Sequence, residues 1–264
     1  MKVQGKVFVV TGGGNGIGRE VVLALLSRGA SVAAVDLKMS ALEETFHLSK
    51  ENPNLSLHQA NITELHRVEE LPTEVISRHG AVDGVINVAG IIQPFVRINE
   101  LDYASIEHVM NVNFYGVLYM TKTFLPELLQ RPEAHIANVS SMGAYAPVPG
   151  QSVYGASKAA VKLMTEGLYA ELLGTNVGVT LIFPGATATN IASNSGITMD
   201  TPADVASMKM TAPAETARLI IDGIENNRYH VFSGSDAKSL DRLARYMPNR
   251  VVKIIYNQMK SLLK

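Results

Sequence analysis

Hydrophobic positions along this chain gather into seven short runs rich in β-branched residues, and longer stretches with helical periodicity separate the runs. The runs cover residues 6–10, 31–36, 55–60, 82–90, 134–140, 178–185 and 229–234. Each run is apolar nearly throughout instead of alternating with polar residues, as expected of strands covered on both faces. Strands that alternate with helices are typical of βαβ units. The pattern therefore predicts an α/β fold with a doubly wound parallel sheet of about seven strands and helices on both faces.

No Pro-, Gly- or Ser-rich linker wide enough to separate domains interrupts this rhythm, so we predict a single domain over residues 1–264. One segment, 186–212, departs from the rhythm because it is long, rich in small residues and contains Met199, Met208 and Met210. A long insertion after a strand in a compact domain is often a lid or binding loop. We interpret 186–212 as a substrate lid, and a plain surface excursion is the alternative.

Composition removes several classes of function. The formal net charge is −1 and the pI is about 6.7, so the chain lacks the basic footprint of a nucleic-acid-binding protein. It has no cysteine, which excludes disulfides, thiolate zinc sites and thiol nucleophiles. No two of the seven histidines stand at ligand spacing, so we predict no metal site. No stretch reaches the ~18 apolar residues of a membrane span, and we expect a soluble, cytoplasmic protein.

A glycine-rich stretch, TGGGNGIG (11–18), lies between the first predicted strand and the first predicted helix. Glycine at such a junction permits a tight turn and lets backbone N–H groups approach a pyrophosphate at the positive end of the helix. The strand–turn–helix setting makes this match more specific than a bare glycine pattern. The stretch therefore predicts a dinucleotide site on a Rossmann-type sheet.

Asp36 ends the second predicted strand, 18 residues after Gly18. An acidic residue at this place accepts hydrogen bonds from the adenosine ribose and repels a 2′-phosphate. Position 37 is leucine, so the residue beside Asp36 offers no arginine to bind that phosphate. We predict that NAD is preferred over NADP, although Lys38 is near enough to leave tolerance of NADP open.

Tyr154 and Lys158 stand four residues apart in YGASK, which places both side chains on one face of a helix. Alone, the pair is an ordinary solvated helical pair. A free tyrosine has a pKa of ~10 and is a poor base at neutral pH. A neighbouring ammonium, together with a positively charged cofactor ring, favours the phenolate, and lowering the pKa by ~3 units requires about 4 kcal/mol.

Taken in order, the motifs resemble those of the short-chain dehydrogenase/reductase (SDR) family over about residues 5–190. They are TGGGNGIG (11–18), NVAG (87–90), NVNFYG (111–116), NVSS (138–141), YGASK (154–158) and PGATAT (184–189). Ser141 lies 13 residues before Tyr154, which is the family's spacing. The chain departs from the family at Val88, where a second asparagine is usual, and at Asn61, where aspartate is common.

The resemblance implies an NAD(H)-dependent oxidoreductase that interconverts a secondary alcohol and a ketone. Its catalytic residues correspond here to Asn113, Ser141, Tyr154 and Lys158. Tyr154 is the implied general acid/base, Ser141 binds the substrate oxygen, Lys158 also holds the nicotinamide ribose, and Asn113 fixes a water that relays protons to Lys158. A non-catalytic dinucleotide sensor or scaffold on the same fold is the alternative function.

The implied cofactor contacts fall on the motifs, on Asp36 at the end of the second strand, and on Asn61 and Ile62 after the third strand. They are Gly12, Asn15, Gly16, Ile17, Gly18, Asp36, Asn61, Ile62, Asn87, Ala89, Tyr154, Lys158, Pro184, Gly185, Thr187 and Thr189. The substrate pocket is predicted from the loop after the fifth strand and from the segment that follows Gly90. Its residues are Ser141, Met142, Tyr145, Val148 and Phe95. This apolar wall favours a lipophilic substrate, unless these side chains only pack the lid.

The C-terminal segment 235–264 holds seven basic and two acidic residues, with apolar side chains at helical spacing around Val252, Ile255, Met259 and Leu262. Such a tail can lie on a membrane surface, pack on a partner subunit or cover its own chain. We favour packing over membrane contact. The family resemblance implies a homodimer or homotetramer built mainly from the helices near 101–130 and 152–174.

Overall fold

The structure is a computed structural model that describes residues 1–197 and 210–263. Seven strands form one parallel sheet in the order β3-β2-β1-β4-β5-β6-β7, which confirms the predicted fold class. The strands are β1 (Val7–Thr11), β2 (Ser31–Asp36), β3 (Leu55–Gln59), β4 (Gly84–Asn87), β5 (Ala134–Val139), β6 (Val177–Pro184) and β7 (His230–Ser233). The order reverses between β1 and β4, and ligands of such sheets bind at the carboxyl ends of the strands beside this switch point.

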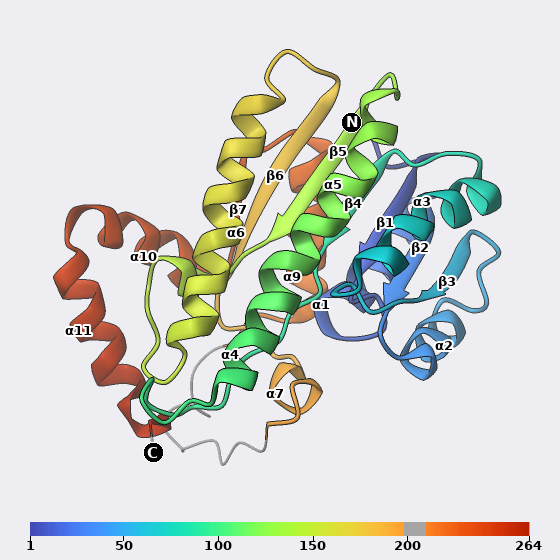
Figure 1. Ribbon diagram of the computed structural model, residues 1–264. Helices are drawn as coiled ribbons and strands as arrows, with labels where there is room; N and C mark the ends of the chain where they lie inside the picture. Colours follow the sequence, from blue (N-terminus) through green and yellow to red (C-terminus); the bar gives the residue numbers. More distant parts are fainter. Residues whose placement is uncertain (198–209, 264) are drawn as a thin grey trace.

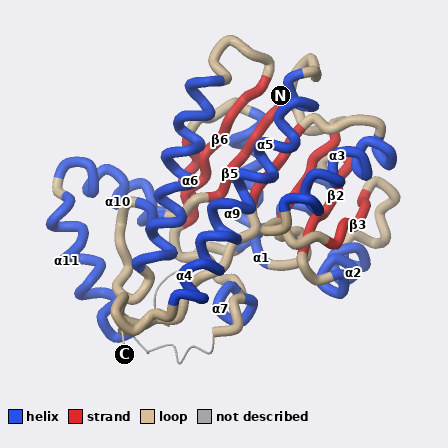
Figure 2. Tube along the Cα trace, viewed as in Figure 1, coloured by secondary structure: helices blue, strands red, loops and turns tan. Residues whose placement is uncertain are grey.

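Helices cover both faces of the sheet (Figures 1 and 2). One face is covered by α1 (Gly16–Ser27), α2 (Met39–Leu48) and α9 (Pro213–Glu225). The other is covered by α3 (Leu65–His79), α5 (Gly116–Leu129) and α6 (Ser152–Glu171). Shorter or peripheral elements are α4 (Tyr103–Met110), the π-helical turn η1 (Asn111–Tyr115), the 3₁₀ turn η2 (Met142–Ala144), α7 (Ile191–Asn194), α10 (Ser235–Tyr246), α11 (Pro248–Met259) and the 3₁₀ turn η3 (Lys260–Leu262). No helix in the described ranges is both long and apolar enough to cross a bilayer.

The central strand β1 shows why the strand runs are apolar at every position. Phe8 and Val10 pack into the core under α1 and α9, whereas Val7 and Val9 pack into the core under α3 and α5. Side chains of a strand alternate between its two faces, so a sheet with two covered faces needs apolar residues throughout. Each fully buried side chain of this size stabilises the fold by about 1.5–3 kcal/mol.

α1 and α9 are distant in sequence but lie against each other on the same face of the sheet. Beyond the end of α1, Arg28 forms ion pairs with Asp222 at 2.9 Å and with Glu225 at 3.2 Å. The pairing therefore joins the beginning of the fold to its last third.

The C-terminal segment folds back as a hairpin of α10 and α11, and one face of it packs on the same chain. Val251 and Ile255 are about 99% buried against Ala146, and Leu262 is also buried. The sequence-based choice of Val252 for this face is wrong, because Val252 is 48% exposed and its neighbour Val251 takes the buried position. Both valines give a helical spacing to the later apolar residues, so the pattern alone does not choose between them.

The segment predicted as a lid is partly described. Its two ends meet, because Thr187 and Thr211 form a short parallel bridge, and α7 lies just after the first of them. Met210 is 42% exposed, while Met199 and Met208 lie outside the described residues. The lid role stays a prediction.

Candidate active site

The glycine loop forms one wall of a cavity of about 340 Å³ at the carboxyl ends of β1, β2 and β4. Gly12 and Gly16 have φ values of +70° and +51°, a region that favours glycine. A Cβ on Gly18 would overlap the carbonyl oxygen of Gly12, so the loop closes only with glycine at that position. The bare backbone beside the start of α1 is the arrangement that accepts a pyrophosphate.

Ten of the predicted cofactor residues line this cavity. They are Gly12, Asn15, Gly16, Ile17, Gly18, Asp36, Asn61, Ile62, Ala89 and Thr189. Twelve lining residues are not among the predicted cofactor residues: Val35, Leu37, Lys38, Ala60, Thr63, Val88, Gly90, Ile91, His108, Val112, Ile191 and Asn194. Val112 and Gly90 stand inside the quoted motifs, which was a usable signal, whereas α7 supplies Ile191 and Asn194 from a segment without a motif.

Asp36 is held at the rim of the cavity by two backbone donors. One carboxylate oxygen accepts from Gly14 N at 3.0 Å and the other from Lys38 N at 3.1 Å. Asn61 is fixed in a local turn, because its Oδ1 accepts from Thr63 N and its Nδ2 donates to Glu64. Both side chains are therefore positioned before any ligand arrives.

Ser141, Tyr154 and Lys158 come together where α6 crosses the end of β5. Tyr154 hydrogen-bonds with the Ser141 hydroxyl, which also accepts from Gly143 N at 3.0 Å. Lys158 is 3% exposed and its Nζ donates to the Val139 carbonyl oxygen at 3.1 Å. Three of the four predicted catalytic residues thus lie in one group.

The fourth, Asn113, is fully buried in the π-helical turn between α4 and α5. Its amide exchanges hydrogen bonds of 2.9 Å with both the N–H and the carbonyl oxygen of Ile91, and it donates to Ser157 at 3.0 Å. A Cβ on Gly90 would lie 3.0 Å from Lys158 Nζ and 3.3 Å from Asn113 Oδ1. The missing side chain of Gly90 therefore leaves room for the lysine beside the asparagine.

Burial controls the protonation of this group. It lowers the pKa of Lys158 to about 8, because no carboxylate compensates for the loss of water around the ammonium. Burial also raises the pKa of Tyr154, and the hydrogen bond with Ser141 opposes that rise only in part. The expected lowering of the phenol pKa is thus not produced by the chain alone, which holds Tyr154 as a protonated acid.

Gln93 is a site residue that the sequence analysis missed. It is 99% buried, and its Oε1 accepts from the first-turn N–H groups of Val153 at 2.8 Å and Tyr154 at 2.9 Å. Its Nε2 donates to the Gly150 carbonyl oxygen at 2.9 Å. Gln93 therefore caps α6 from a distant loop and fixes the backbone that carries Tyr154. Sixty residues separate it from that helix, so no local pattern reveals the cap.

The other predicted cofactor residues have internal partners. Asn87 is buried and donates to Asn138 Oδ1 at 2.8 Å, so its side chain joins the ends of β4 and β5. Gly185 N donates to Ser233, and Thr187 donates to the Gly185 carbonyl oxygen, which holds the turn that follows Pro184. Their contacts with a cofactor stay predictions.

The predicted substrate-pocket residues lie beneath the C-terminal hairpin. The Tyr145 hydroxyl donates to the Ala237 carbonyl oxygen at 2.7 Å, and Val148 packs with the hairpin cluster. At the other end, a Cβ on Gly150 would lie 3.2 Å from both Leu263 and the backbone of Phe95. Met142 is 9% exposed. Apolar side chains surround these positions, and the chain's own C-terminal segment contacts them; their role as a substrate pocket stays a prediction.

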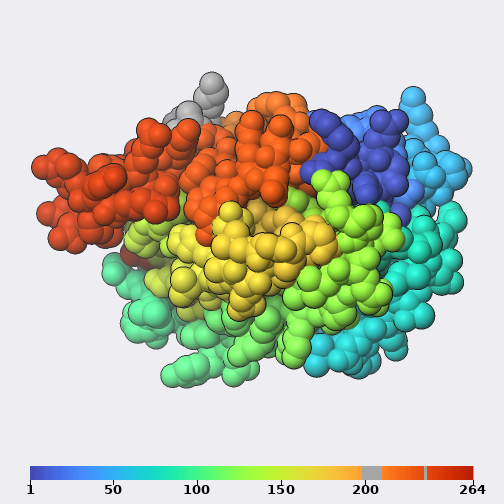
Figure 3. Space-filling view, turned by 90° about the horizontal axis from the view of Figure 1, so that it is seen from above, coloured from blue at the N-terminus to red at the C-terminus, as the bar shows by residue number. Residues whose placement is uncertain are grey.

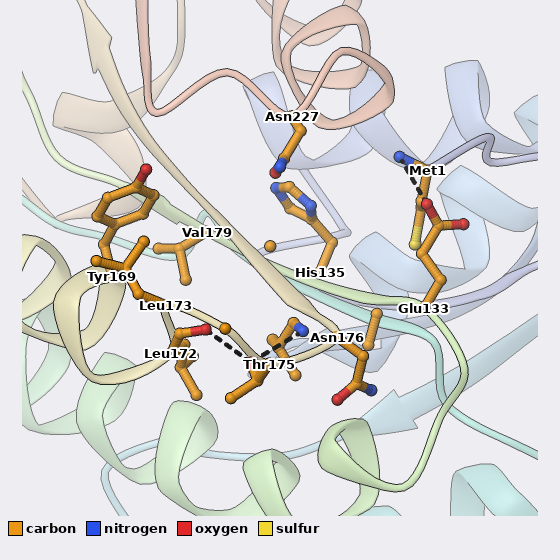
Figure 4. A pocket seen from close by; sticks show the side chains of 14 residues that line it. Met1, Glu133, His135, Tyr169, Leu172, Leu173, Thr175, Asn176, Val179 and Asn227 are labelled. Carbon is orange, nitrogen blue, oxygen red and sulfur yellow. Dashed lines mark hydrogen bonds and ion pairs between the residues drawn. The ribbon is translucent and has the colours of Figure 1, made fainter.

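A second cavity, of about 240 Å³, lies at the opposite, amino-terminal ends of β5 and β6 (Figure 4). His135 is buried in it, and Asn227 points toward the imidazole ring. The ring meets Thr180 Oγ1 at 2.8 Å, and since Thr180 donates to the Arg228 carbonyl oxygen, His135 Nε2 is the donor. Burial lowers the pKa of His135 to about 3. Among the described residues, no three His, Asp or Glu side chains gather as metal ligands.

The family model described as "short chain dehydrogenase" matches residues 6–200. The chain belongs to the short-chain dehydrogenase family. SadH of Mycobacterium tuberculosis, named as an oxidoreductase without a stated substrate, is 32% identical over 261 residues, which cover 96% of this chain and 94% of SadH. The 3-ketodihydrosphingosine reductase of Dictyostelium discoideum is 30% identical over 251 residues, which cover 87% of this chain and 75% of that protein.

Solved structures of short-chain dehydrogenases share the fold. One from Burkholderia cenocepacia, in complex with NADP, has a TM-score of 0.82 at 26% identity and covers 97% of this chain and 99% of its own. One from Burkholderia phymatum, in complex with NAD, has a TM-score of 0.85 at 23% identity. The match covers 95% of this chain and 96% of that structure's chain. This short-chain dehydrogenase is therefore an oxidoreductase of a family that uses nicotinamide dinucleotides. Because one structural neighbour is a complex with NAD and the other with NADP, they do not show which of the two this chain prefers.

Proposed function

We propose that this chain interconverts a secondary alcohol and a ketone with NAD(H), and that Tyr154 transfers the proton. The observation that carries the proposal is the Ser141–Tyr154 hydroxyl pair beside the buried ammonium of Lys158. A protein that only binds a dinucleotide has no use for this pair, whereas carbonyl chemistry needs both a proton donor and a hydrogen bond to the substrate oxygen.

The residues at the cavity fit a nicotinamide dinucleotide. The glycine loop offers bare backbone for the pyrophosphate, and Asp36 is fixed at the rim for the adenosine ribose. The nicotinamide ring, when bound, supplies the hydride acceptor for oxidation or the donor for reduction. Preference for NAD rests on the Asp36 carboxylate, which repels a 2′-phosphate, although Lys38 lines the same cavity.

The chain's own groups would act on the proton as follows. Tyr154, kept protonated by burial, donates its proton to the carbonyl oxygen during reduction, and Ser141 donates a hydrogen bond to the same oxygen. Below a pH of about 8 Lys158 is mainly cationic and stabilises the phenolate that remains. Asn113 positions the water that returns a proton to Lys158.

A lipophilic substrate is favoured by the wall under the C-terminal hairpin. Tyr145, Val148 and the chain near Leu263 form an apolar surface beside the loop that carries Ser141. Such walls bind apolar groups with a few polar contacts to fix orientation. The relative named 3-ketodihydrosphingosine reductase supports this class of substrate.

The alternative is a non-catalytic dinucleotide sensor or scaffold, and one experiment separates it from the enzyme. NADH and NADPH binding is titrated, and a panel of apolar ketones and alcohols is then assayed on wild type, Tyr154→Phe and the control Tyr103→Phe. We expect tighter NADH binding, retained binding in Tyr154→Phe, and loss of turnover only in that variant. Undiminished turnover by Tyr154→Phe contradicts the proton-transfer role, and absence of turnover in wild type across the panel favours the sensor.

We also propose a homodimer or homotetramer that uses the outer faces of α5 and α6. Leu163 on α6 is 71% exposed and Leu129 on α5 is 43% exposed, and apolar side chains in such positions are commonly covered by a second subunit. Light scattering on the full chain tests the assembly, and a monomer at every concentration contradicts it.

A further inference from the structure

The hairpin of α10 and α11 projects from one end of the molecule, beyond the edge strand β7 (Figures 1 and 3). Its inner face is covered by the same chain, because Val251 and Ile255 are buried against Ala146. Its outer face and its tip, at the turn between Tyr246 and Pro248, are exposed.

The exposed surface of the hairpin is unusually apolar. Five of the fifteen large hydrophobic residues exposed among the described residues lie between positions 246 and 256. Tyr246 and Met247 are at the tip, Val252 and Tyr256 lie together on one flank of α11, and Ile254 lies on the opposite flank. Tyr246 at the tip is 83% exposed. Clustered exposed apolar side chains mark an interaction surface, whereas scattered ones are ordinary.

The same surface is strongly cationic. Segment 235–264 holds seven of the chain's 23 basic residues but only two of its 24 acidic residues, so it carries about +5 in a chain whose net charge is −1. Lys238, Arg242 and Tyr246 follow one another at intervals of one helical turn and share one face of α10. In the described part of the chain Arg242, Arg250, Lys253 and Lys260 are exposed and have no ion-pair partner. The apolar tip is thus bordered by cations whose charge no residue in the ranges 1–197 and 210–263 neutralises through an ion pair.

We propose that the outer face of the α10–α11 hairpin docks on the surface of an anionic lipid bilayer. Tyr246 and Met247 at the tip would enter the headgroup region, where an aromatic ring with a polar end is stable. The unpaired arginines and lysines would contact lipid phosphates, because cations near an anionic membrane are attracted in proportion to their number. A helix hairpin that presents apolar side chains together with cations fits an anionic bilayer, because the apolar side chains insert among the headgroups and the cations are attracted to the lipid phosphates.

The position of the hairpin gives the docking a purpose at the proposed active site. Its inner side holds Tyr145 through Ala237, and its end at Leu263 reaches Gly150 and Phe95. The hairpin therefore stands between the proposed bilayer surface and the apolar wall. The docking itself does not depend on the enzymatic proposal, and its test does not use activity.

The test is sedimentation of the full chain with vesicles of phosphatidylcholine alone and of phosphatidylcholine mixed with phosphatidylglycerol. We expect binding to the mixed vesicles only, and release by high salt. The pair Arg250→Glu/Lys253→Glu should weaken partitioning by roughly 100-fold or more, since four units of charge change near the surface. The pair Lys50→Glu/Arg228→Glu makes the same change in net charge on exposed basic residues outside the hairpin, α5 and α6, and should bind nearly as wild type.

The tip is tested separately with Tyr246→Ser against Tyr103→Ser, whose tyrosine is 82% exposed on α4. We expect Tyr246→Ser to lower partitioning by about 10-fold at constant charge and Tyr103→Ser to leave it unchanged. Equal binding to neutral and anionic vesicles, or equal effects of the two charge pairs, overturns the proposal. Absence of vesicle binding together with a dimer that only the hairpin pair disrupts also overturns it, and identifies a second copy of the chain as the partner. Unaltered melting temperatures confirm that each variant is folded.

Discussion

Replacement of Gln93 by methionine should destabilise the catalytic helix at its first turn. The side chains have similar length and volume, so Gln93→Met keeps the buried packing and removes only the carboxamide. Three hydrogen bonds of 2.8–2.9 Å are lost, two from the start of α6 and one to Gly150. The first-turn N–H groups of Val153 and Tyr154 have no other acceptor in the helix.

The expected cost follows from the two kinds of group left unpaired. Loss of a helix N-cap costs about 0.5–2 kcal/mol, and a buried polar group without a partner costs about 1–3 kcal/mol. Because the start of α6 is only partly buried, water can replace some of the lost contacts, and we expect a loss of about 2–4 kcal/mol in the free energy of unfolding. At about 2–4 °C per kcal/mol for a large domain, the melting temperature should fall by roughly 4–16 °C.

The same change should reduce turnover more than cofactor binding. A misplacement of ~1 Å at a reacting group costs up to about 100-fold in rate, and Tyr154 is held by the cap, whereas the glycine loop is not. We therefore expect kcat to fall by roughly 10- to 100-fold with little change in the Kd for NADH. Thermal melting, NADH titration and ketone reduction measure the three quantities.

Two further variants control this experiment. Gln93→Glu keeps both acceptor contacts with the helix but sets an oxygen against the Gly150 carbonyl oxygen, so it should recover part of the stability only at a pH at which the buried carboxyl is protonated and can donate. Gln130→Met removes a single 3.4 Å bond from an exposed glutamine and should change nothing measurable. A Gln93→Met protein with wild-type melting temperature and kcat would refute the assignment of Gln93 as the cap of α6.

Burial lowers the pKa of Lys158 to about 8 from 10.5, so the unfolded chain binds more protons between these values and stability rises with pH there. Lys158→Met should be about 3 kcal/mol more stable than wild type at pH 7, an advantage that denaturant unfolding should show disappearing by pH 10.5. The pKa of His135 is lowered from 6.5 to about 3, so its contribution is lost as pH falls through this range, and His135→Gln should flatten the acid limb of the same curve. Gly18→Ala should abolish NADH binding in a titration because its Cβ overlaps Gly12, whereas Gly167→Ala meets open space and should raise stability by about 0.5–1 kcal/mol. Unchanged pH dependence in either buried variant, or NADH binding by Gly18→Ala, would contradict the corresponding argument.

The sequence predicts the sheet well because a strand covered on both faces must be apolar at every position, and Phe8 to Val10 show this in the structure. It also predicts the meeting of Ser141, Tyr154 and Lys158, since their motifs follow a strand end and one helical turn. Interactions that depend on tertiary contact are not predictable in this way. Gln93 caps a helix that begins about sixty residues later, and a contact over that distance produces no periodic pattern in the sequence.

The choice between Val251 and Val252 shows a second limit. Adjacent residues on a helix differ in direction by about 100°, but either valine gives an acceptable spacing to Ile255 and Leu262. Only the surface against which the helix packs decides which of them is buried. The partner of Tyr145 is also set by tertiary packing. Its hydroxyl donates to the carbonyl oxygen of Ala237 in α10, a helix that begins ninety residues later.

The contact between α1 and α9 has a consequence for how the protein is made. The chain is synthesised from its N-terminus, so α1 is complete after residue 27 while its partner α9 ends only at residue 225. β1 likewise gains β4, its second neighbour in the sheet, only after residues 84–87 have been added. The apolar face of α1 therefore stays uncovered on the ribosome for most of the time of synthesis, a state that exposes nascent chains to aggregation. The sheet can be completed only after β7 (His230–Ser233), in the last third of the chain, has been translated.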